Sequence, residues 1–367
     1  MTEREARIAF NMIPAIGSVT VARLAAEADG SVAEAYERYP DKLDWEGKPP
    51  DWEREIARAE KMKIAIVTEL DEAYPSLLRE IASPPLAIYV AGDPAVLSKA
   101  GVALVGTRAA TAYGRDTAER FAAGLVQRGW AVFSGLAAGI DAAAHRGALL
   151  GGGATAGILG GALDCFYPNE NRALAREMVE RGGCVASEFP LGRRPDPQTF
   201  PQRNRLVSGI SHGVVAVECP QRSGTLITCA RAAEQGRPVM AVPGRIDWKT
   251  ASGCNALIRD GARLVTSVDD ILEELTPLGR EMPPPAASRP TKPTRSRERA
   301  AKTSSPSPSF TVEEAVVMRE IPHGGATLDA VSRAAKLPMA RLNTLLVGLR
   351  LKGRVKFLPG NRVVAVS

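Results

Sequence analysis

The chain has 367 residues, too many for one ordinary domain, and its 45% hydrophobic and 24% charged residues exclude a wholly disordered chain. Five scattered cysteines without a CxxC pair exclude a disulfide framework and a structural zinc site. Because the sequence has no signal-like start and no long apolar run, we expect a soluble cytoplasmic protein. The net charge of +6 arises at the C-terminal end, because residues 277–367 carry 16 Lys and Arg against 6 Asp and Glu.

Residues 1–62 predict a small helical domain. Two apolar-periodic stretches are joined by Ile13, Pro14, Ala15, Ile16 and Gly17, an arrangement that resembles a helix-hairpin-helix or sterile-alpha-motif-like module. The glycine is expected to permit a tight turn between the two helices. Such a hairpin can contact DNA or serve packing alone, and the sequence leaves both open.

Residues 63–276 predict a Rossmann-like domain. Apolar strands alternate with helical stretches, one of which runs from Tyr113 to Arg128. The expected strands are 102–106, 131–134, 155–159, 184–187, 213–217 and 238–242. Because they are apolar almost without interruption, both faces should be buried, which indicates a parallel sheet covered by helices. Right-handed crossovers then make the α/β fold an extended, doubly wound sheet.

Residues 277–309 predict a disordered basic linker rich in Pro and Ser, and residues 310–367 a winged helix. The linker lacks the apolar area that would offset the entropy of ordering. Three helices followed by a hairpin are the element order of a winged helix. The basic charge of this end favours a nucleic-acid partner, although a solubilising linker would have the same composition.

Small residues and one arginine follow the first two of these strands. Gly106, Thr107 and Arg108 stand at the end of the first strand, and Ser134 and Gly135 stand at the end of the second. Parallel strands end at one edge of the sheet, where ligands bind. Backbone amides and helix N-termini can hold a phosphate there, although tight helix packing also favours glycine.

The sequence disfavours nucleotide-driven catalysis. No Gly-Lys-Ser/Thr pattern exists, and the turn that would carry a dinucleotide fingerprint carries Arg108, which points to direct phosphate contact by a guanidinium. No nucleophile elbow, carboxylate pair or metal-ligand spacing is present, and His145 is expected to satisfy a hydrogen bond within its helix. Asp141 is expected to orient Arg108 or the adjacent backbone. We therefore predict no catalytic residue, no cofactor and no metal.

Two later blocks favour binding of a single strand. Phe200, Arg203, Asn204 and Arg205 combine phosphate-binding charge with a stacking surface, although Phe200 could also be a core residue. A second block of hydroxyls and glycine lies at the start of a helix, where it could form an anion-binding nest, an N-cap or both. Its members are Ser223, Gly224, Thr225 and Thr228.

Several blocks, in this order, resemble the signature of the DprA/Smf family over residues 74–275. They are Val105-Gly106-Thr107-Arg108, Ser134 to Asp141 with His145, Tyr167-Pro168, Ser187-Glu188, Phe200 to Arg205 and Ser223 to Thr228. The resemblance implies a non-enzymatic protein that binds incoming single-stranded DNA during natural transformation, loads the RecA recombinase and forms a homodimer through the Rossmann-like domain. The DNA-binding residues that it implies, with the edge residues above, are Gly106, Thr107, Arg108, Ser134, Gly135, Phe200, Arg203, Asn204, Arg205, Ser223, Gly224, Thr225 and Thr228.

Two other functions remain open. Related Rossmann-like folds bind or hydrolyse nucleotides, as in the phosphoribohydrolases of the Lonely Guy family, whose motif is only partly matched by Ser223, Gly224 and Thr225. The winged helix could instead make the chain a duplex-binding regulator. A buried stripe of Leu342, Leu345, Leu346 and Leu349 would leave polar residues outward on its third helix, and the candidate duplex contacts are Arg341, Arg354, Lys356 and Arg362.

Overall fold

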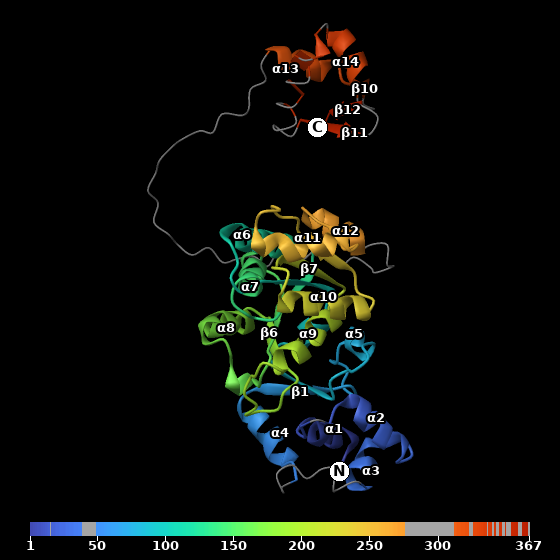
Figure 1. Ribbon diagram of the computed structural model, residues 1–367, viewed down its shortest axis with the longest axis vertical. Helices are drawn as coiled ribbons and strands as arrows, with labels where there is room; N and C mark the ends of the chain where they lie inside the picture. Colours follow the sequence, from blue (N-terminus) through green and yellow to red (C-terminus); the bar gives the residue numbers. More distant parts are fainter. Residues whose placement is uncertain are drawn as a thin grey trace. The chain divides into compact units, whose positions relative to one another are not determined.

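The computed structural model describes residues 1–14, 16–38, 49–275, 312–322, 326–335, 337–339, 341–342, 345–346, 349, 354–358 and 362–365. The chain forms two compact units, Met1–Arg289 and Pro290–Ser367, drawn in Figure 1. The expected linker, 277–309, lies outside the described residues. The division into four domains therefore stays a prediction.

The larger unit is built around one nine-stranded sheet. Its parallel part runs, in spatial order, through β6 (Cys184–Ser187), β5 (Thr155–Ile158), β4 (Ala131–Ser134), β3 (Gly101–Gly106), β7 (Gly213–Glu218), β8 (Val239–Ala241) and β9 (Arg263–Leu264). The sequence did not predict β9, which extends the parallel part, nor β2 (Ala87–Gly92) and β1 (Ile64–Thr68), which add an antiparallel edge beside β6. The predicted doubly wound parallel sheet is thus confirmed, and it is extended at both edges.

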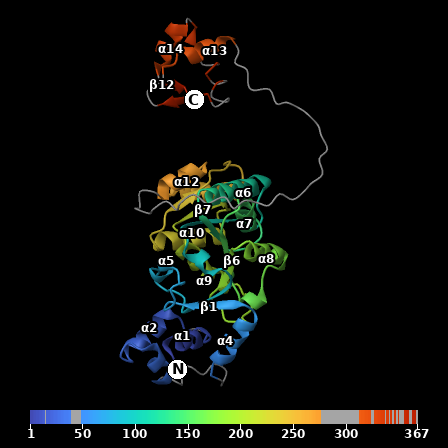
Figure 2. The ribbon, with the colours of Figure 1, turned by 180° about the vertical axis from the view of Figure 1, so that it is seen from behind.

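The strands form because their side chains are buried on both faces. In β3, Val102 and Leu104 pack into one core, and Ala103 and Val105 pack into another on the opposite face. The helices that cover the first face are α6 (Ala112–Gln127), α7 (Ile140–Leu150) and α12 (Val268–Leu275). Those that cover the second are α5 (Ser76–Arg79), α9 (Thr199–Gly209), α10 (Gly224–Glu234) and α11 (Ser252–Arg259), and Figure 2 shows the two groups from behind.

The strand order places a topological switch point between β3 and β7. From β3 the chain moves outward through β4, β5 and β6, with α8 (Arg172–Glu180) between the last two, and then returns to β7 on the other side of β3. The connections that follow β3 and β7 therefore lead away from each other. A crevice at the carboxyl ends of two such strands is the usual ligand site of an open α/β sheet.

The N-terminal helices pack on the antiparallel edge of the sheet. They are α1 (Glu3–Asn11), α2 (Ser18–Ala26), α3 (Val32–Arg38) and α4 (Trp52–Lys61). Ile8 of α1 shares a core with Tyr89 of β2, and Thr2 caps α1 through a capping box with Glu5. Gly17 is the N-cap of α2 in extended backbone, and an added Cβ would meet nothing within 4 Å. The glycine that was expected to permit a tight turn is therefore not needed for its backbone conformation, which any residue can adopt.

The smaller unit contains α13 (Val312–Arg319), α14 (Leu328–Ala335) and a three-stranded sheet. In spatial order the strands are β10 (Ala326–Thr327), β12 (Arg362–Ala365) and β11 (Val355–Leu358). The described residues between 339 and 349 are helical, and the predicted stripe of Leu342, Leu345, Leu346 and Leu349 is buried. This arrangement confirms the winged helix. Among the described residues of the whole chain, no helix has the length and apolarity needed to cross a membrane.

Candidate nucleic-acid interface

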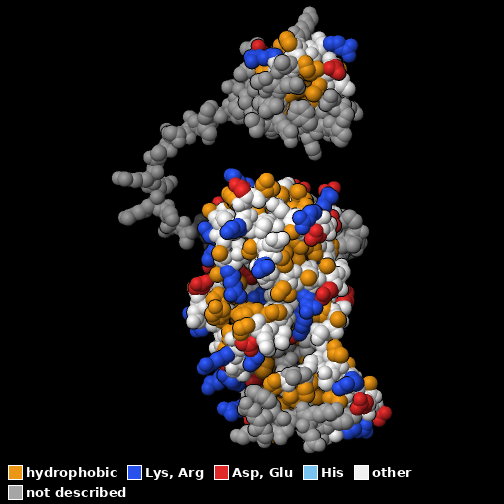
Figure 3. Space-filling model, in the orientation of Figure 1, with side chains coloured by type: hydrophobic (Ala, Val, Ile, Leu, Met, Phe, Trp, Pro, Cys, Tyr) orange, Lys and Arg blue, Asp and Glu red, His pale blue; other side chains and the backbone are white. Residues whose placement is uncertain are grey.

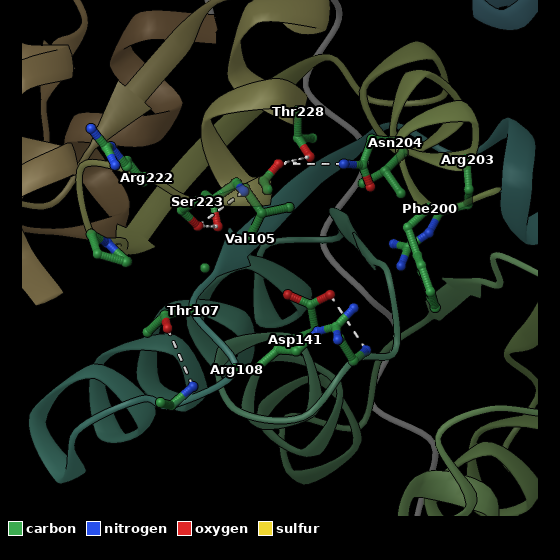
Figure 4. Close-up of a pocket in the computed structure, with 17 residues that line it drawn as sticks. Val105, Thr107, Arg108, Asp141, Phe200, Arg203, Asn204, Arg222, Ser223 and Thr228 are labelled. Atoms are coloured by element: carbon green, nitrogen blue, oxygen red, sulfur yellow. Dashed lines mark hydrogen bonds between the residues drawn. The ribbon is translucent and has the colours of Figure 1, made fainter. Parts of the chain in front are cut away.

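A pocket of about 360 Å³ opens at the switch point between β3 and β7 (Figure 4). Four segments build its wall: the turn after β3, the N-terminal end of α7, the first half of α9 and the turn that leads into α10. The lining residues are Val105, Gly106, Thr107, Arg108, Ala109, Ala137, Asp141, Phe200, Arg203, Asn204, Val207, Pro220, Arg222, Ser223, Gly224, Thr225 and Thr228. Three of them are arginines and one is a carboxylate, so the wall carries a net positive charge.

Most residues predicted for the site meet in this pocket, including Arg108, Arg203 and Ser223, which come from three different segments. They meet because the segments that carry them all end at the same edge of the sheet. The distribution of surface charge alone does not identify the position of the pocket. Figure 3 shows Lys and Arg side chains distributed along the visible face of the larger unit, among Asp and Glu.

Arg203 is a buried cation without a partner. Its residue is 6% exposed, its Nε is buried without a hydrogen-bond partner, and its guanidinium makes no hydrogen bond or ion pair with another described residue. The pKa of Arg203 is lowered to about 10, mainly by burial; Asp141 opposes this shift and the charge of Arg108 contributes to it. Figure 4 shows Arg203 extending from α9 toward the centre of the pocket. A buried guanidinium that faces an open pocket is satisfied best by an anion.

Gly135 makes room for this guanidinium. A Cβ added at Gly135 would lie 1.5 Å from Arg203 Nη1, so the glycine that follows β4 supports the site although it does not line the pocket. Its N–H donates to Asp141 Oδ2 at 3.1 Å, and the N–H of Ala137 donates to the same oxygen at 3.4 Å. Asp141 thus orients the adjacent backbone, one of its two predicted roles. Burial raises the pKa of Asp141, and Arg203 opposes that shift.

The turn after β3 is fixed by backbone contacts. The N–H of Thr107 donates to the carbonyl of Glu218 at the end of β7 (2.7 Å), and the Thr107 hydroxyl accepts from the N–H of Ala109 (3.2 Å). Gly139 approaches so closely that a Cβ would lie 2.3 Å from the Thr107 carbonyl, and its φ is +79°. Only glycine fits there readily. These contacts hold Arg108 at the mouth of the pocket.

Arg108 and Tyr167 both contact the Phe200 ring at one side of the pocket. The Arg108 guanidinium lies 5.1 Å from the centre of the Phe200 ring, and the Tyr167 ring centre lies 6.1 Å from it. A Cβ at Gly160 would approach the same ring to 2.9 Å, so Phe200 rests against backbone on that side. Half-buried Phe200 is therefore a rim residue rather than a core residue. We call Arg108, Phe200 and Tyr167 the first platform.

The N-terminus of α10 forms the opposite wall. Ser223 is its N-cap: the Ser223 Oγ accepts from the N–H of Thr225 (3.2 Å) and donates to the Thr225 hydroxyl (3.0 Å). Asn204 Nδ2 donates to the Gly224 carbonyl at 3.3 Å, which ties α9 to α10. A Cβ at Gly224 would meet nothing within 4 Å, so the protein itself does not require glycine there. The positive end of the helix dipole favours an anion there.

Besides Gly135, two predicted residues lie outside the pocket lining. Ser134 is buried and donates its hydroxyl hydrogen to the Leu104 carbonyl at 2.6 Å. Arg205 forms a short ion pair with Glu188. It points away from the pocket because it lies two residues after Arg203 on the helix, on another face.

Arg222 and Tyr167 are two functional side chains at the pocket that were not among the predicted DNA-binding residues. Arg222 lines the pocket immediately before the hydroxyl block, and Tyr167 contacts Phe200 from the segment after β5. Both positions follow strands of the parallel sheet, and this location was the sequence signal that could have identified them as site residues.

His145 is structural. Its Nδ1 pairs at 2.7 Å with the hydroxyl of Thr155, which itself donates to the Val132 carbonyl. Burial lowers the pKa of His145 to about 3, so the ring is neutral. The prediction of a partner within its own helix is wrong, because the ring reaches across to β5. Among the described residues, no group of three or more His, Cys, Asp or Glu side chains could hold a metal ion.

The duplex-contact candidates lie in the smaller unit. Arg341 pairs with Glu313 at 2.6 Å, and Arg354 is half-buried beside β11. Lys356 and Arg362 stand on the paired strands β11 and β12. A role of these four residues in duplex binding stays a prediction.

Comparison with known proteins decides the family. The family model described as DNA recombination-mediator protein A matches residues 65–276, which include every segment of the pocket wall. The chain belongs to this DprA family. A second model, the DprA winged helix domain, matches residues 298–361.

DprA proteins from two species illustrate the similarity. DNA processing protein DprA of Streptococcus pneumoniae is 42% identical over 205 residues, which are 56% of this chain and 72% of that protein. The crystal structure of DprA from that species aligns with a TM-score of 0.62 at 34% identity and covers 75% of this chain and 98% of that one. DNA processing protein A of Helicobacter pylori, whose structure is described in terms of its single-stranded DNA binding mode, aligns with a TM-score of 0.53 at 26% identity, covering 59% of this chain and 96% of that one.

Proposed function

We propose that this DprA protein binds single-stranded DNA in the pocket between β3 and β7. A backbone phosphate lies against Arg203 and the N-terminus of α10, and a neighbouring base stacks on the first platform. The observation that carries the proposal is the unpaired, buried guanidinium of Arg203. A desolvated cation needs an anion, and phosphate matches the planar fork of a guanidinium.

The shape of the site favours a single strand over a duplex. The cation is recessed in a pocket of about 360 Å³, and the Phe200 ring is partly buried beside it. An unpaired strand can turn its phosphate inward and its base outward onto an aromatic ring, whereas the bases of a duplex are already stacked on one another. The Helicobacter pylori relative binds single-stranded DNA, which supports the same ligand here.

The wider role follows from the family. We propose that the protein holds the strand without cleaving or modifying it, loads the RecA recombinase onto it, and acts as a homodimer through the Rossmann-like domain. The description of the family as a recombination mediator supports this assignment.

A binding experiment tests the proposal. Fluorescence anisotropy of labelled oligo-dT, a matching duplex and labelled AMP would be measured with the wild-type protein and with an Arg108→Ala/Arg203→Ala variant. The matched control is Arg176→Ala, which removes an exposed arginine of α8 that does not line the pocket. We expect tight binding of oligo-dT by the wild type and the control, and loss of binding in the double variant.

Other outcomes contradict the proposal in distinct ways. Equal affinity for duplex and single strand would favour a regulator that acts through the winged helix. Binding or turnover of AMP would favour a nucleotide enzyme.

A further inference from the structure

An exposed aromatic pair lies outside the pocket. Tyr113, in the first turn of α6, is 48% exposed, and Trp248, in the loop after β8, is 36% exposed. Their ring centres are 6.4 Å apart and the rings meet edge to face at 72°. Large aromatic side chains in contact with each other and still open to solvent are typical of a binding surface.

Short segments connect this pair to both walls of the pocket. Tyr113 stands four residues after Ala109, which lines the pocket. Trp248 leads directly into η5 (Lys249–Ala251) and α11, and at the start of α11 the Ser252 hydroxyl accepts from the N–H of Gln221 at 3.1 Å. Gln221 is the neighbour of Arg222 in the pocket wall. The pair is therefore continuous with the pocket rim.

The loop that carries Trp248 is held in place. Asn255 of α11 binds Gly244 twice, accepting from its N–H at 3.1 Å and donating to its carbonyl at 2.9 Å. The Arg245 guanidinium lies 5.5 Å from the centre of the Trp248 ring. Arg245 is ion-paired with Asp247 at 2.7 Å, so the exposed Lys249 beside Trp248 supplies the remaining positive charge next to the pair.

The strand order separates Tyr167 of the first platform from Trp248. Tyr167 is in the connection that follows β5, Trp248 is in the loop that follows β8, and β4, β3 and β7 lie between these two strands. Arg203, Arg108 and Arg222 line the pocket.

We infer that Tyr113 and Trp248 form a second base-stacking platform, which receives the single strand after it has passed the pocket and so lengthens its footprint. The inference rests on the proposed function, because it needs a strand seated at Arg203. The arginines of the pocket hold phosphates between two aromatic ends, the combination of charge and stacking that sequence-independent binding of a single strand uses. A protein partner would also suit Tyr and Trp, but the continuity with a cationic pocket favours DNA.

The test varies the length of the oligonucleotide. Anisotropy would give the affinity of the full-length wild type, Trp248→Ala, Tyr113→Ala and Trp248→Phe for a series of oligo-dT lengths, from about three nucleotides upward. We expect Trp248→Ala and Tyr113→Ala to bind the long oligonucleotides at least about fivefold more weakly than the wild type does, and the shortest ones equally well. Trp248→Phe, which keeps a ring, should retain most of the wild-type affinity. Binding of a long oligonucleotide should also quench tryptophan fluorescence, and Trp248→Ala should lose that quenching.

The control lies in the same loop. Ile246 is 97% exposed, so Ile246→Ala removes apolar surface without an aromatic ring and should leave every affinity unchanged. Unchanged affinity of Trp248→Ala at all lengths would overturn the inference. The inference would also be overturned if sedimentation showed the same change of oligomeric state in Trp248→Ala and Ile246→Ala, because the surface around Trp248 would then serve contacts between copies of the chain. Both results leave the proposed function intact, whereas insensitivity to Arg203→Ala at every length refutes the proposed function itself.

Discussion

Two arginines of α9, Arg203 and Arg205, have opposite environments. Arg203 is 6% exposed, faces the pocket and has no carboxylate or carbonyl bound to its guanidinium among the described residues. Arg205 faces the other side of the helix, where Glu188 neutralises it. Two arginines that are two residues apart on one helix thus differ: Arg205 is ion-paired, and Arg203 is not paired with a described residue. The difference teaches that a cation marks a binding site when its own protein leaves it unpaired.

Arg205→Ala should give the largest effect, and it should be on stability. The variant leaves Glu188 buried without its cation, and we expect the free energy of unfolding to fall by about 3 kcal/mol, the lower end for a buried pair because the Arg205 side chain is 21% exposed. Urea unfolding measures this change. Arg205→Met combined with Glu188→Met, which removes both charges, should recover most of the loss. Folded Arg205→Ala should still bind oligo-dT, and a loss of binding at unchanged stability would instead make Arg205 a DNA contact.

Arg203→Ala should show the reverse pattern. It removes a charge that makes no hydrogen bond or ion pair with a described residue, although the buried Asp141 loses a favourable neighbour, so the free energy of unfolding should fall by less than it does in Arg205→Ala. Affinity for oligo-dT should fall by about 10- to 150-fold, which corresponds to the 1.5–3 kcal/mol of a hydrogen bond to a charged group. Anisotropy and urea unfolding on the same preparation separate the two effects. Strong destabilisation with unchanged affinity would remove the contrast between the two arginines.

Phe200→Ala tests stacking on the same face of α9. Loss of the ring should weaken oligo-dT binding about tenfold, within the range of 1–3 kcal/mol per stacked base. Phe200→Tyr keeps a ring and should bind nearly as well as the wild type. If Phe200→Ala keeps its affinity, the ring has only a packing role against Gly160.

Asp141 should give the smallest effect, and it concerns pH. Burial raises the pKa of this carboxyl group, so it takes up a proton at a higher pH than an ordinary aspartate as the solution is acidified. Protonation removes a negative charge from the pocket wall, and oligo-dT affinity should rise severalfold. Asp141→Asn should bind severalfold more tightly than the wild type at neutral pH and show a flatter pH profile. A wild-type profile identical to that of Asp141→Asn would exclude a role for this carboxylate.

The parallel strands could be predicted because their signal is local. Strands such as β3 and β7 are apolar almost throughout, and burial on both faces follows directly from that. The antiparallel edge formed by β1 and β2 could not be predicted, since pairing direction depends on contacts that are remote in sequence. The residues gathered at the pocket were predictable for the same reason as the strands: each follows a strand of one sheet.

The difference between Arg203 and Arg205 could not be predicted. Glu188, which neutralises Arg205, follows β6 and becomes its neighbour only when α9 folds back over the sheet. The charge pattern of the segment is symmetrical around Asn204, and no local signal says which arginine has a partner. Only the tertiary contacts show that Arg205 contributes to stability and that Arg203 faces the pocket.

The salt dependence of binding tests most directly whether Arg203 holds a phosphate. For a single strand, the logarithm of the binding constant falls with the logarithm of the salt concentration by about 0.7 for each phosphate neutralised. We predict that Arg203→Ala reduces the steepness of this line by about 0.7, whereas Arg205→Ala leaves it unchanged. A line of Arg203→Ala that runs parallel to that of the wild type would contradict the account, because the guanidinium would then act without contacting the DNA backbone.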